Sequence, residues 1–162
     1  MKFLNSSLII ILFQITLSAC SVSKEARSMK KDINGDWVLE TIVTEGITGV
    51  AKTTVFNEAE FPCFIGSEWN FISNNSMGSY TIVDPMKGCP PVKRFIRWSV
   101  YEPKDAAKEF QFKRLDDKKN AMDEGAGFRL TVAELDNSKM KLKSDITFAG
   151  HPAAIIYNFG KK

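Results

Sequence analysis

EWNFISNNSMGSYTIV, residues 68–83, contains two short runs in which apolar and polar side chains alternate on either side of a turn. Trp69 and Phe71 share one face of the first run, and alternation at period two is typical of half-buried strands. The intervening Asn74-Asn75-Ser76-Met77-Gly78 supplies residues that favour turns. The stretch therefore predicts an antiparallel hairpin with strands at 68–72 and 79–83.

The same alternation continues through the chain from Gly35 onward, whereas helical periodicity is weak. In Lys139–Lys143 (KMKLK) the lysines are expected to face water, and Met140 and Leu142 are expected to face the core. Strands with one solvent-exposed face and one buried face indicate a closed barrel or a sandwich. The strands that we expect cover residues 36–44, 53–56, 68–72, 79–83, 95–101, 109–115, 127–135, 139–148 and 153–159.

An all-β fold follows, and the preferred architecture is an antiparallel up-and-down β-barrel of about eight strands. Closure removes the exposed edges that a long meander of consecutive strands would otherwise present. A two-sheet β-sandwich is the alternative. Residues 45–62, the longest irregular piece, are expected to hold a lid-like loop or an extra short strand.

Composition sets limits on function. The 162 residues are 44% hydrophobic and 25% charged, which fits one globular domain. The net charge of +3 is spread along the chain, and this argues against a nucleic-acid partner, which usually requires a clustered basic face. With one His and three Cys, the chain lacks parts for most metal and triad chemistries, so we expect no metal and no cofactor.

The first 19 residues have a charged start at Lys2 and an interrupted apolar run, the pattern of a secretory signal peptide. Leu17-Ser18-Ala19-Cys20 at its end resembles the lipobox of bacterial lipoproteins. The resemblance implies cleavage before Cys20 and attachment of diacylglycerol and palmitate-type chains to it. The alternative is an ordinary signal peptide followed by a chance Cys.

The expected organisation is therefore a signal peptide at 1–19, an acylated Cys and flexible tether at 20–33, and a barrel domain at 34–162. Several acyl chains would hold the protein at a membrane without spanning it. Ser21 stands where Asp often signals retention in the inner membrane. We therefore expect a cell-envelope protein, anchored through Cys20 at the outer membrane, with its face unknown.

Cys63 and Cys89 remain as an even pair in an oxidising compartment. The turn at 74–78 lies nearly midway between them, so an antiparallel hairpin brings them together across its open end. We predict a disulfide, contributing roughly 3.5 kcal/mol in the chain-entropy model. Two free buried thiols are the alternative.

Residues around the hairpin form the series Cys63, Gly66-Ser67, Trp69, Asn74-Asn75 and Gly78-Ser79-Tyr80. This series resembles the lipocalin-like lipoproteins of Gram-negative bacteria. Gly35-Asp36-Trp37 is similar to the Gly-x-Trp signature of the lipocalin superfamily, which implies that Trp37 plugs the closed end of the barrel. The chain departs from the pattern because no terminal helix follows Phe159 and no Arg is clearly placed over Trp37.

No constellation of residues predicts catalysis, so we expect a protein that is not an enzyme. His151 is alone, in the expected turn Gly150-His151-Pro152, and is expected to be solvated. An acidic loop matches no calcium-binding spacing, and we expect it to be solvated as well. Its residues are Asp116, Asp117, Asp123 and Glu124.

Aromatic side chains that point inward either line a ligand pocket or fill the barrel. Arg97 distinguishes the two possible phases of its strand: it faces the surface if Ile96, Trp98 and Val100 face inward, and otherwise enters the lumen. A lumen arginine would need a partner such as a ligand carboxylate. Alternation places Trp37, Trp69, Phe71, Tyr80, Phe110, Phe112 and Phe128 inside, and the candidate ligand-binding residues are Trp69, Phe71, Tyr80, Trp98, Phe110, Phe112 and Phe128.

We therefore predict a lipid-anchored, lipocalin-like envelope protein that binds a small hydrophobic or amphipathic molecule. The alternative is a structural or protein-interaction module with a filled barrel. A lumen of about 300 Å³ or more would favour the first, and a large exposed apolar patch would favour the second. A third function, inhibition of a hydrolase by a loop such as 84–94, has no supporting motif.

Overall fold

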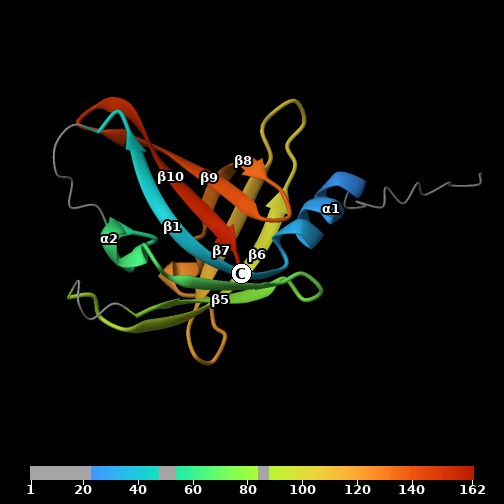
Figure 1. Cartoon of the computed structure of the whole chain (residues 1–162), viewed down its shortest axis with the longest axis horizontal. Helices are drawn as coiled ribbons and strands as arrows, with labels where there is room; N and C mark the ends of the chain where they lie inside the picture. Colours follow the sequence, from blue (N-terminus) through green and yellow to red (C-terminus); the bar gives the residue numbers. More distant parts are fainter. Residues whose placement is uncertain (1–22, 48–53, 84–87) are drawn as a thin grey trace, which may run out of the picture.

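Eight antiparallel strands close into a barrel in the computed structural model, which describes residues 23–47, 54–83 and 88–162 (Figure 1). Around the barrel the order is β1-β10-β9-β8-β7-β6-β5-β4, so strands consecutive from β4 to β10 are neighbours and β1 closes the ring. The predicted up-and-down barrel is confirmed, and the sandwich alternative is wrong. The strands are β1 (Gly35–Glu45), β4 (Glu68–Ile72), β5 (Met77–Ile82), β6 (Val92–Tyr101), β7 (Glu109–Leu115), β8 (Phe128–Leu135), β9 (Lys139–Phe148) and β10 (His151–Lys161).

The hairpin β4–β5 has the register that its sequence pattern requires. Trp69 pairs with Tyr80 and Phe71 pairs with Gly78, so the aromatic side chains share the inner face. A Cβ atom at Gly78 would lie 2.4 Å from the carbonyl oxygen of Asn70, and only glycine fits this approach. The turn before β5 is tightened by the Asn75 side chain, whose oxygen accepts a hydrogen bond from the Met77 amide at 2.9 Å.

Between β1 and β4 the chain forms an insert, which we define as residues 54–64. It consists of β2 (Thr54–Val55), β3 (Ala59–Glu60) and the short helix α2 (Phe61–Phe64). The strand expected at 53–56 is therefore only two residues long, and it pairs with β3 in a separate sheet instead of joining the barrel. The expected lid-like loop or short strand is found here, except that residues 48–53 lie outside the described part of the chain.

Helix α1 (Lys24–Ile33) corrects the prediction of a flexible tether, which is wrong over this span. Ser23 caps the helix by accepting a hydrogen bond from the Ala26 amide at 2.9 Å. Ala26, Met29 and Ile33 form one buried face, and the helix contacts β6 and β8. This mostly charged segment forms a helix because its narrow apolar face packs against the end of the barrel.

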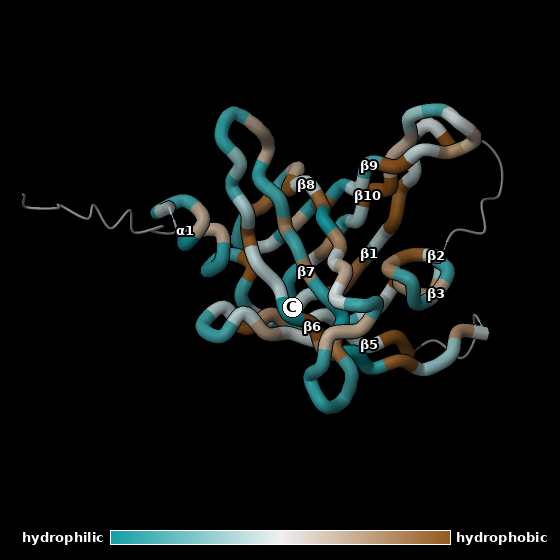
Figure 2. Tube along the Cα trace, turned by 180° about the vertical axis from the view of Figure 1, so that it is seen from behind, coloured by the Kyte–Doolittle hydropathy of each residue, from teal (hydrophilic) through white to brown (hydrophobic). Residues whose placement is uncertain are grey.

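The α-helices α1 and α2 lie at opposite ends of the barrel, with α1 at one end and the insert at the other (Figures 1 and 2). We call the insert end the mouth. Along the strands in Figure 2 hydrophobic and hydrophilic segments alternate, and the turns are mainly hydrophilic. Both ends of the barrel are thus covered by chain that is not part of its sheet.

Trp37 is fully buried at the α1 end, where its indole Nε1 donates a hydrogen bond to the Ile33 carbonyl at 2.7 Å. The cation that the sequence did not place over this ring is Lys161, whose Nζ lies 5.0 Å from the ring centroid. Lys161 Nζ also donates to the Asp32 carbonyl at 2.9 Å. This arrangement arises because β10 runs two residues beyond its expected end and pairs Lys161 with Trp37.

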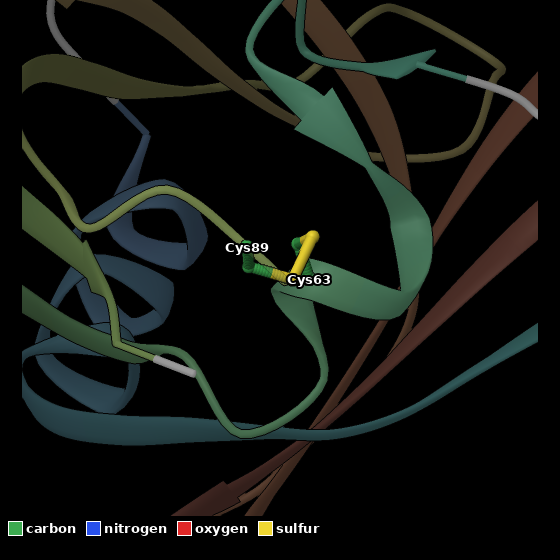
Figure 3. Close-up of a disulfide and its surroundings, with 2 residues drawn as sticks. All are labelled: Cys63 and Cys89. Carbon is green, nitrogen blue, oxygen red and sulfur yellow. A yellow bond between two sulfur atoms is a disulfide. The ribbon is translucent and has the colours of Figure 1, made fainter. Parts of the chain in front are cut away.

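A disulfide joins Cys63 and Cys89, as predicted, with a Cα–Cα distance of 5.6 Å. It connects α2 to the segment that leads into β6 (Figure 3). One end of the insert is therefore fixed covalently to the barrel, while β2 and β3 lie on the N-terminal side of that attachment.

Candidate functional site at the barrel mouth

The inward-facing aromatic side chains are where the alternation places them. Six of the seven are buried, and Phe128 is half-buried with its ring 5.1 Å from that of Phe112. In β6, Ile96 and Trp98 are buried and Arg97 is exposed, so Arg97 lies on the outer face of the barrel. The buried candidate ligand-binding residues are Trp69, Phe71, Tyr80, Trp98, Phe110 and Phe112.

Phe56 of the insert occupies the centre of this aromatic chamber, a position that no alternation in the sequence predicts. Its ring stacks on Tyr157 with a centroid distance of 5.1 Å, and it lies 5.0 Å from Phe112. Three further rings surround it, those of Phe64, Trp69 and Phe128. The barrel is therefore filled at the mouth by a side chain that does not belong to a barrel strand.

The backbone that presents Phe56 is strained. Phe56 and Asn57 both have φ near +52°, and the Glu58 amide donates to the Val55 carbonyl at 3.1 Å across this turn. Two successive positive φ values are typical of type I′ turns, which favour Asn-Gly. A bulky residue at the first of these positions costs roughly 1–2 kcal/mol and is retained only where its contacts compensate.

Glu58, two residues after Phe56, is the centre of a polar network of side chains at the mouth. Its side chain is 9% exposed, and Arg94 binds both carboxylate oxygens, with Nε 2.9 Å from Oε2 and Nη2 2.8 Å from Oε1. Oε2 also accepts hydrogen bonds from the Tyr80 hydroxyl at 2.8 Å and from Arg114 Nη1 at 2.8 Å. One carboxylate thus satisfies three donor groups from β5, β6 and β7.

Arg114 is the most buried charged residue in this network, with 4% of the residue exposed. Its second partner is Asp123, whose Oδ1 and Oδ2 lie 2.6 Å from Nη2 and 2.9 Å from Nε. The expectation that Asp123 belongs to a solvated acidic loop is therefore wrong, because this carboxylate turns back onto the barrel to pair with Arg114. Two guanidinium groups and two carboxylates balance each other at the mouth.

The protonation equilibria follow from this pairing. Burial alone would raise the pKa of Glu58, but hydrogen bonds from Arg94 and Tyr80 and the charges of Arg94 and Arg114 hold it below its usual value. The hydrogen bond from Arg114 lowers the pKa of Asp123. Burial, together with the hydrogen bond to Glu58, raises the pKa of Tyr80, so its hydroxyl remains a donor. Both carboxylates and both guanidinium groups of the network are charged at neutral pH, and Tyr80 is neutral.

A sequence signal for the two arginines does exist. Once Ile96 and Trp98 fix the phase of β6, Arg94 must point inward, and Phe110 and Phe112 fix Arg114 in the same way. The lumen arginine considered at position 97 is thus found at 94 and 114. Glu58 had no such signal, because its position depends on the path of the insert.

A cavity of about 590 Å³ opens over β6, β7 and β8, and its lining includes Trp98, Phe112 and Phe128 of the candidate ligand-binding residues. Arg97, Lys113 and Arg129 are exposed at its surface, and Arg97 pairs directly with Lys113 across the two strands. Like charges placed opposite each other in a sheet repel. This groove is the second feature of the described residues that could bind a partner.

His151 lies at the first position of β10, after the turn, and it is exposed. Within residues 23–47, 54–83 and 88–162, no three His, Cys, Asp or Glu side chains gather as metal ligands. In the same part of the chain, no helix is long and apolar enough to cross a bilayer. Cys20 and the signal peptide lie outside the described residues.

Fold and site together define a closed eight-stranded antiparallel barrel whose mouth is occupied by an inserted segment of its own chain. No protein-family model and no curated protein matches the sequence. Among solved structures, a lipocalin-like protein from Bacteroides uniformis is similar, with a TM-score of 0.46 and 15% identity. The match covers 81% of this chain and 99% of that chain.

Proposed function

We propose that this protein is a lipid-anchored component of the cell envelope that binds a small amphipathic molecule in its barrel, and that the β2–β3 hairpin of the insert leaves the mouth when the ligand enters. The observation that supports this most strongly is the position of Phe56. An aromatic side chain from outside the barrel sheet occupies the space among Trp69, Phe112 and Tyr157 where a ligand would bind. Barrels of eight strands are wide enough for one small ligand.

The insert is attached in a way that would let it move. β2 and β3 pair only with each other, through Thr54 with Glu60 and Val55 with Ala59, so no sheet pairing joins them to the barrel. Side-chain contacts of Val55, Phe56 and Glu58 hold them in place, against the strained backbone of the turn. Displacing the hairpin therefore leaves the barrel strands paired.

The envelope location and the anchor rest on Leu17-Ser18-Ala19-Cys20, and the Cys63–Cys89 disulfide suits the oxidising compartment that such a location provides. Replacing Cys20 by Ser should abolish labelling with palmitate and release the protein from the membrane fraction. Continued palmitate labelling of the variant would refute the anchor.

Ligand binding is tested with Phe56→Ala and the neutral fluorescent probe Nile red. Removal of the ring should leave an apolar cavity at the mouth, and we expect the variant to bind the probe at least about tenfold more tightly than the wild type. Val43→Ala, at an outer position that is 49% exposed, is the matched control and should not change binding. A folded Phe56→Ala protein that binds no probe would contradict the proposed function.

A second candidate is an interaction module with a permanently filled barrel, and the groove over β6, β7 and β8 favours it. Arg97 and Lys113 repel each other there, so an acidic partner would relieve an unfavourable contact. Binding of Nile red by the wild type separates the two functions, because a permanently filled barrel would bind none, whereas the cavity left by Phe56→Ala would bind an apolar probe in either case.

A further inference from the structure

Two arginines point into the mouth of an otherwise aromatic chamber, Arg94 from β6 and Arg114 from β7. Tyr80 on β5 lies beside them and pairs across the sheet with Arg94. Buried cations require partners of opposite charge. One partner, Asp123, comes from the loop between β7 and β8, but the other, Glu58, comes from the insert.

We propose that Arg94, Arg114 and Tyr80 form the binding site for the carboxylate headgroup of the barrel ligand, and that Glu58 and Phe56 occupy this site as an internal substitute for that ligand. The inference rests on the proposed function and names the chemical class: an amphiphile with a single carboxylate and an apolar tail. The tail would take the place of the Phe56 ring, and the headgroup would take the place of the Glu58 carboxylate.

The geometry of the site supports the replacement of the Glu58 carboxylate by a ligand carboxylate. The planar guanidinium of Arg94 binds both oxygens of Glu58, which is the arrangement that guanidinium groups form with any free carboxylate. Arg114 Nη1 and the Tyr80 hydroxyl converge on Oε2 from two other strands. All three donors are held by the barrel and not by the insert, so they remain at the mouth when the β2–β3 hairpin leaves.

Charge counting restricts the headgroup to a monoanion. With Glu58 in place, the network holds two guanidinium charges against the carboxylates of Glu58 and Asp123. Withdrawal of Glu58 leaves one positive charge uncompensated at a nearly buried position. One ligand carboxylate restores neutrality, a neutral ligand leaves the excess charge, and a dianion reverses it.

Occupation of the site by Glu58 and Phe56 also limits how tightly the wild type can bind a ligand. A ligand must compete with Glu58 and Phe56, so its apparent affinity is reduced by the fraction of molecules in which the mouth is closed. Weakening the insert should therefore raise affinity. Removing the Glu58 charge should raise it specifically for anionic ligands.

The probe pair that tests the headgroup is cis-parinaric acid and its methyl ester, which share a tail and differ in charge. All variants are made in the full chain carrying Cys20→Ser, so that no protein compared is acylated. Glu58→Gln should bind the acid at least about tenfold more tightly than the ester, since hydrogen bonds to a charged group contribute that much. In Phe56→Ala, which keeps Glu58 on the arginines, the acid should have little advantage.

Arg94→Gln, combined with Glu58→Gln, should reduce the ratio of acid affinity to ester affinity from at least about tenfold to about one. Arg94 is suited to this test because 22% of its side chain is exposed, whereas Arg114 is nearly buried and its loss threatens folding. The matched control is Arg129→Gln on the outer face, where 71% of the side chain is exposed, and it should leave the preference intact. Thermal unfolding confirms that each variant is folded.

If Arg94→Gln does not fold, the ionisation of bound ¹³C-carboxyl palmitate in Glu58→Gln provides the same answer. The carboxylate should stay ionised at a pH where free palmitate is protonated, because two arginines face it. Equal binding of acid and ester by Glu58→Gln, or a bound carboxyl group with ordinary ionisation, would overturn the headgroup site and leave the proposed function standing. Failure of both probes in both Glu58→Gln and Phe56→Ala would instead overturn the proposed function.

Discussion

Glu58 shows how one side chain can hold a barrel closed. Its carboxylate accepts hydrogen bonds from side chains of β5, β6 and β7, and the nearby Phe56 ring packs among the aromatic side chains of the barrel. Truncating one partner of a buried charge pair is costly because the other charge remains buried and uncompensated. The closed mouth should therefore depend on the ionisation of this residue.

Stability against pH tests that dependence. The pKa of Glu58 is lower in the folded than in the unfolded protein, so its contribution is fully present above the unfolded value and disappears as pH falls through the folded value. We expect Glu58→Gln to lower the free energy of unfolding by about 2 kcal/mol at pH 7. The difference from wild type should shrink steadily below about pH 4.

Urea unfolding at a series of pH values measures both quantities. Glu68→Gln is the control, because this glutamate is exposed on β4 and should change stability little at any pH. A difference between wild type and Glu58→Gln that stays constant down to pH 3 would show that the carboxylate charge is not what holds the insert.

At the scale of elements, α1 is part of the folded domain. Ile33 is fully buried beneath Trp37, and its carbonyl accepts the indole hydrogen bond. Ile33→Ala should lower the free energy of unfolding by about 3 kcal/mol, the usual cost of removing a large aliphatic side chain from a core. Lys31→Ala, on the exposed face of the same helix, should cost less than about 0.5 kcal/mol.

Chemical denaturation of the two variants measures these costs. If α1 were a tether, both substitutions would have the same small effect. The comparison therefore separates a helix that closes the barrel from one that only connects the barrel to its anchor.

The same element shows what the sequence could and could not predict. Strand runs with regular alternation, such as Glu68–Ile72 and Glu109–Leu115, are found with their expected bounds, because each needs only local pattern and one buried face. Local pattern predicts neither helix α1 nor the separate pairing of β2 with β3, because the few apolar residues of these segments are buried only against the ends of the folded barrel. The disulfide was predictable since the hairpin between its cysteines fixes their distance.

The candidate site divides in the same manner. Alternation brings Tyr80, Arg94 and Arg114 to one patch of the inner surface, and this could be deduced once the phases of β6 and β7 were known. Phe56, Glu58 and Asp123 come from segments without period, whose side chains are directed by turns with positive φ. Tertiary contacts of the side chains stabilise such turns, so the local amino-acid composition does not predict them.

At the scale of the whole molecule, the insert and the barrel should be separate cooperative units. The Cys63–Cys89 bond fixes α2 to the segment before β6, whereas β2 and β3 have no sheet pairing with the barrel. Local opening of the mouth then breaks the contacts of Phe56 and Glu58 without unfolding any barrel strand. Units of this kind open at lower free energy than the global transition.

Native-state hydrogen exchange, with and without reduction of the disulfide, distinguishes one unit from two. The Glu58 amide, bonded to the Val55 carbonyl, should exchange through an opening several kcal/mol easier than that of the β9–β10 amides, which exchange only on global unfolding. Reduction should lower protection of the β9–β10 amides by roughly 3.5 kcal/mol, because it removes the constraint on the unfolded chain. Protection at Glu58 should change far less, since opening of the β2–β3 turn leaves the bond between Cys63 and Cys89 unstressed.

An equal loss of protection at both places would mean that insert and barrel open together, and the mouth could then admit a ligand only when the whole protein unfolds.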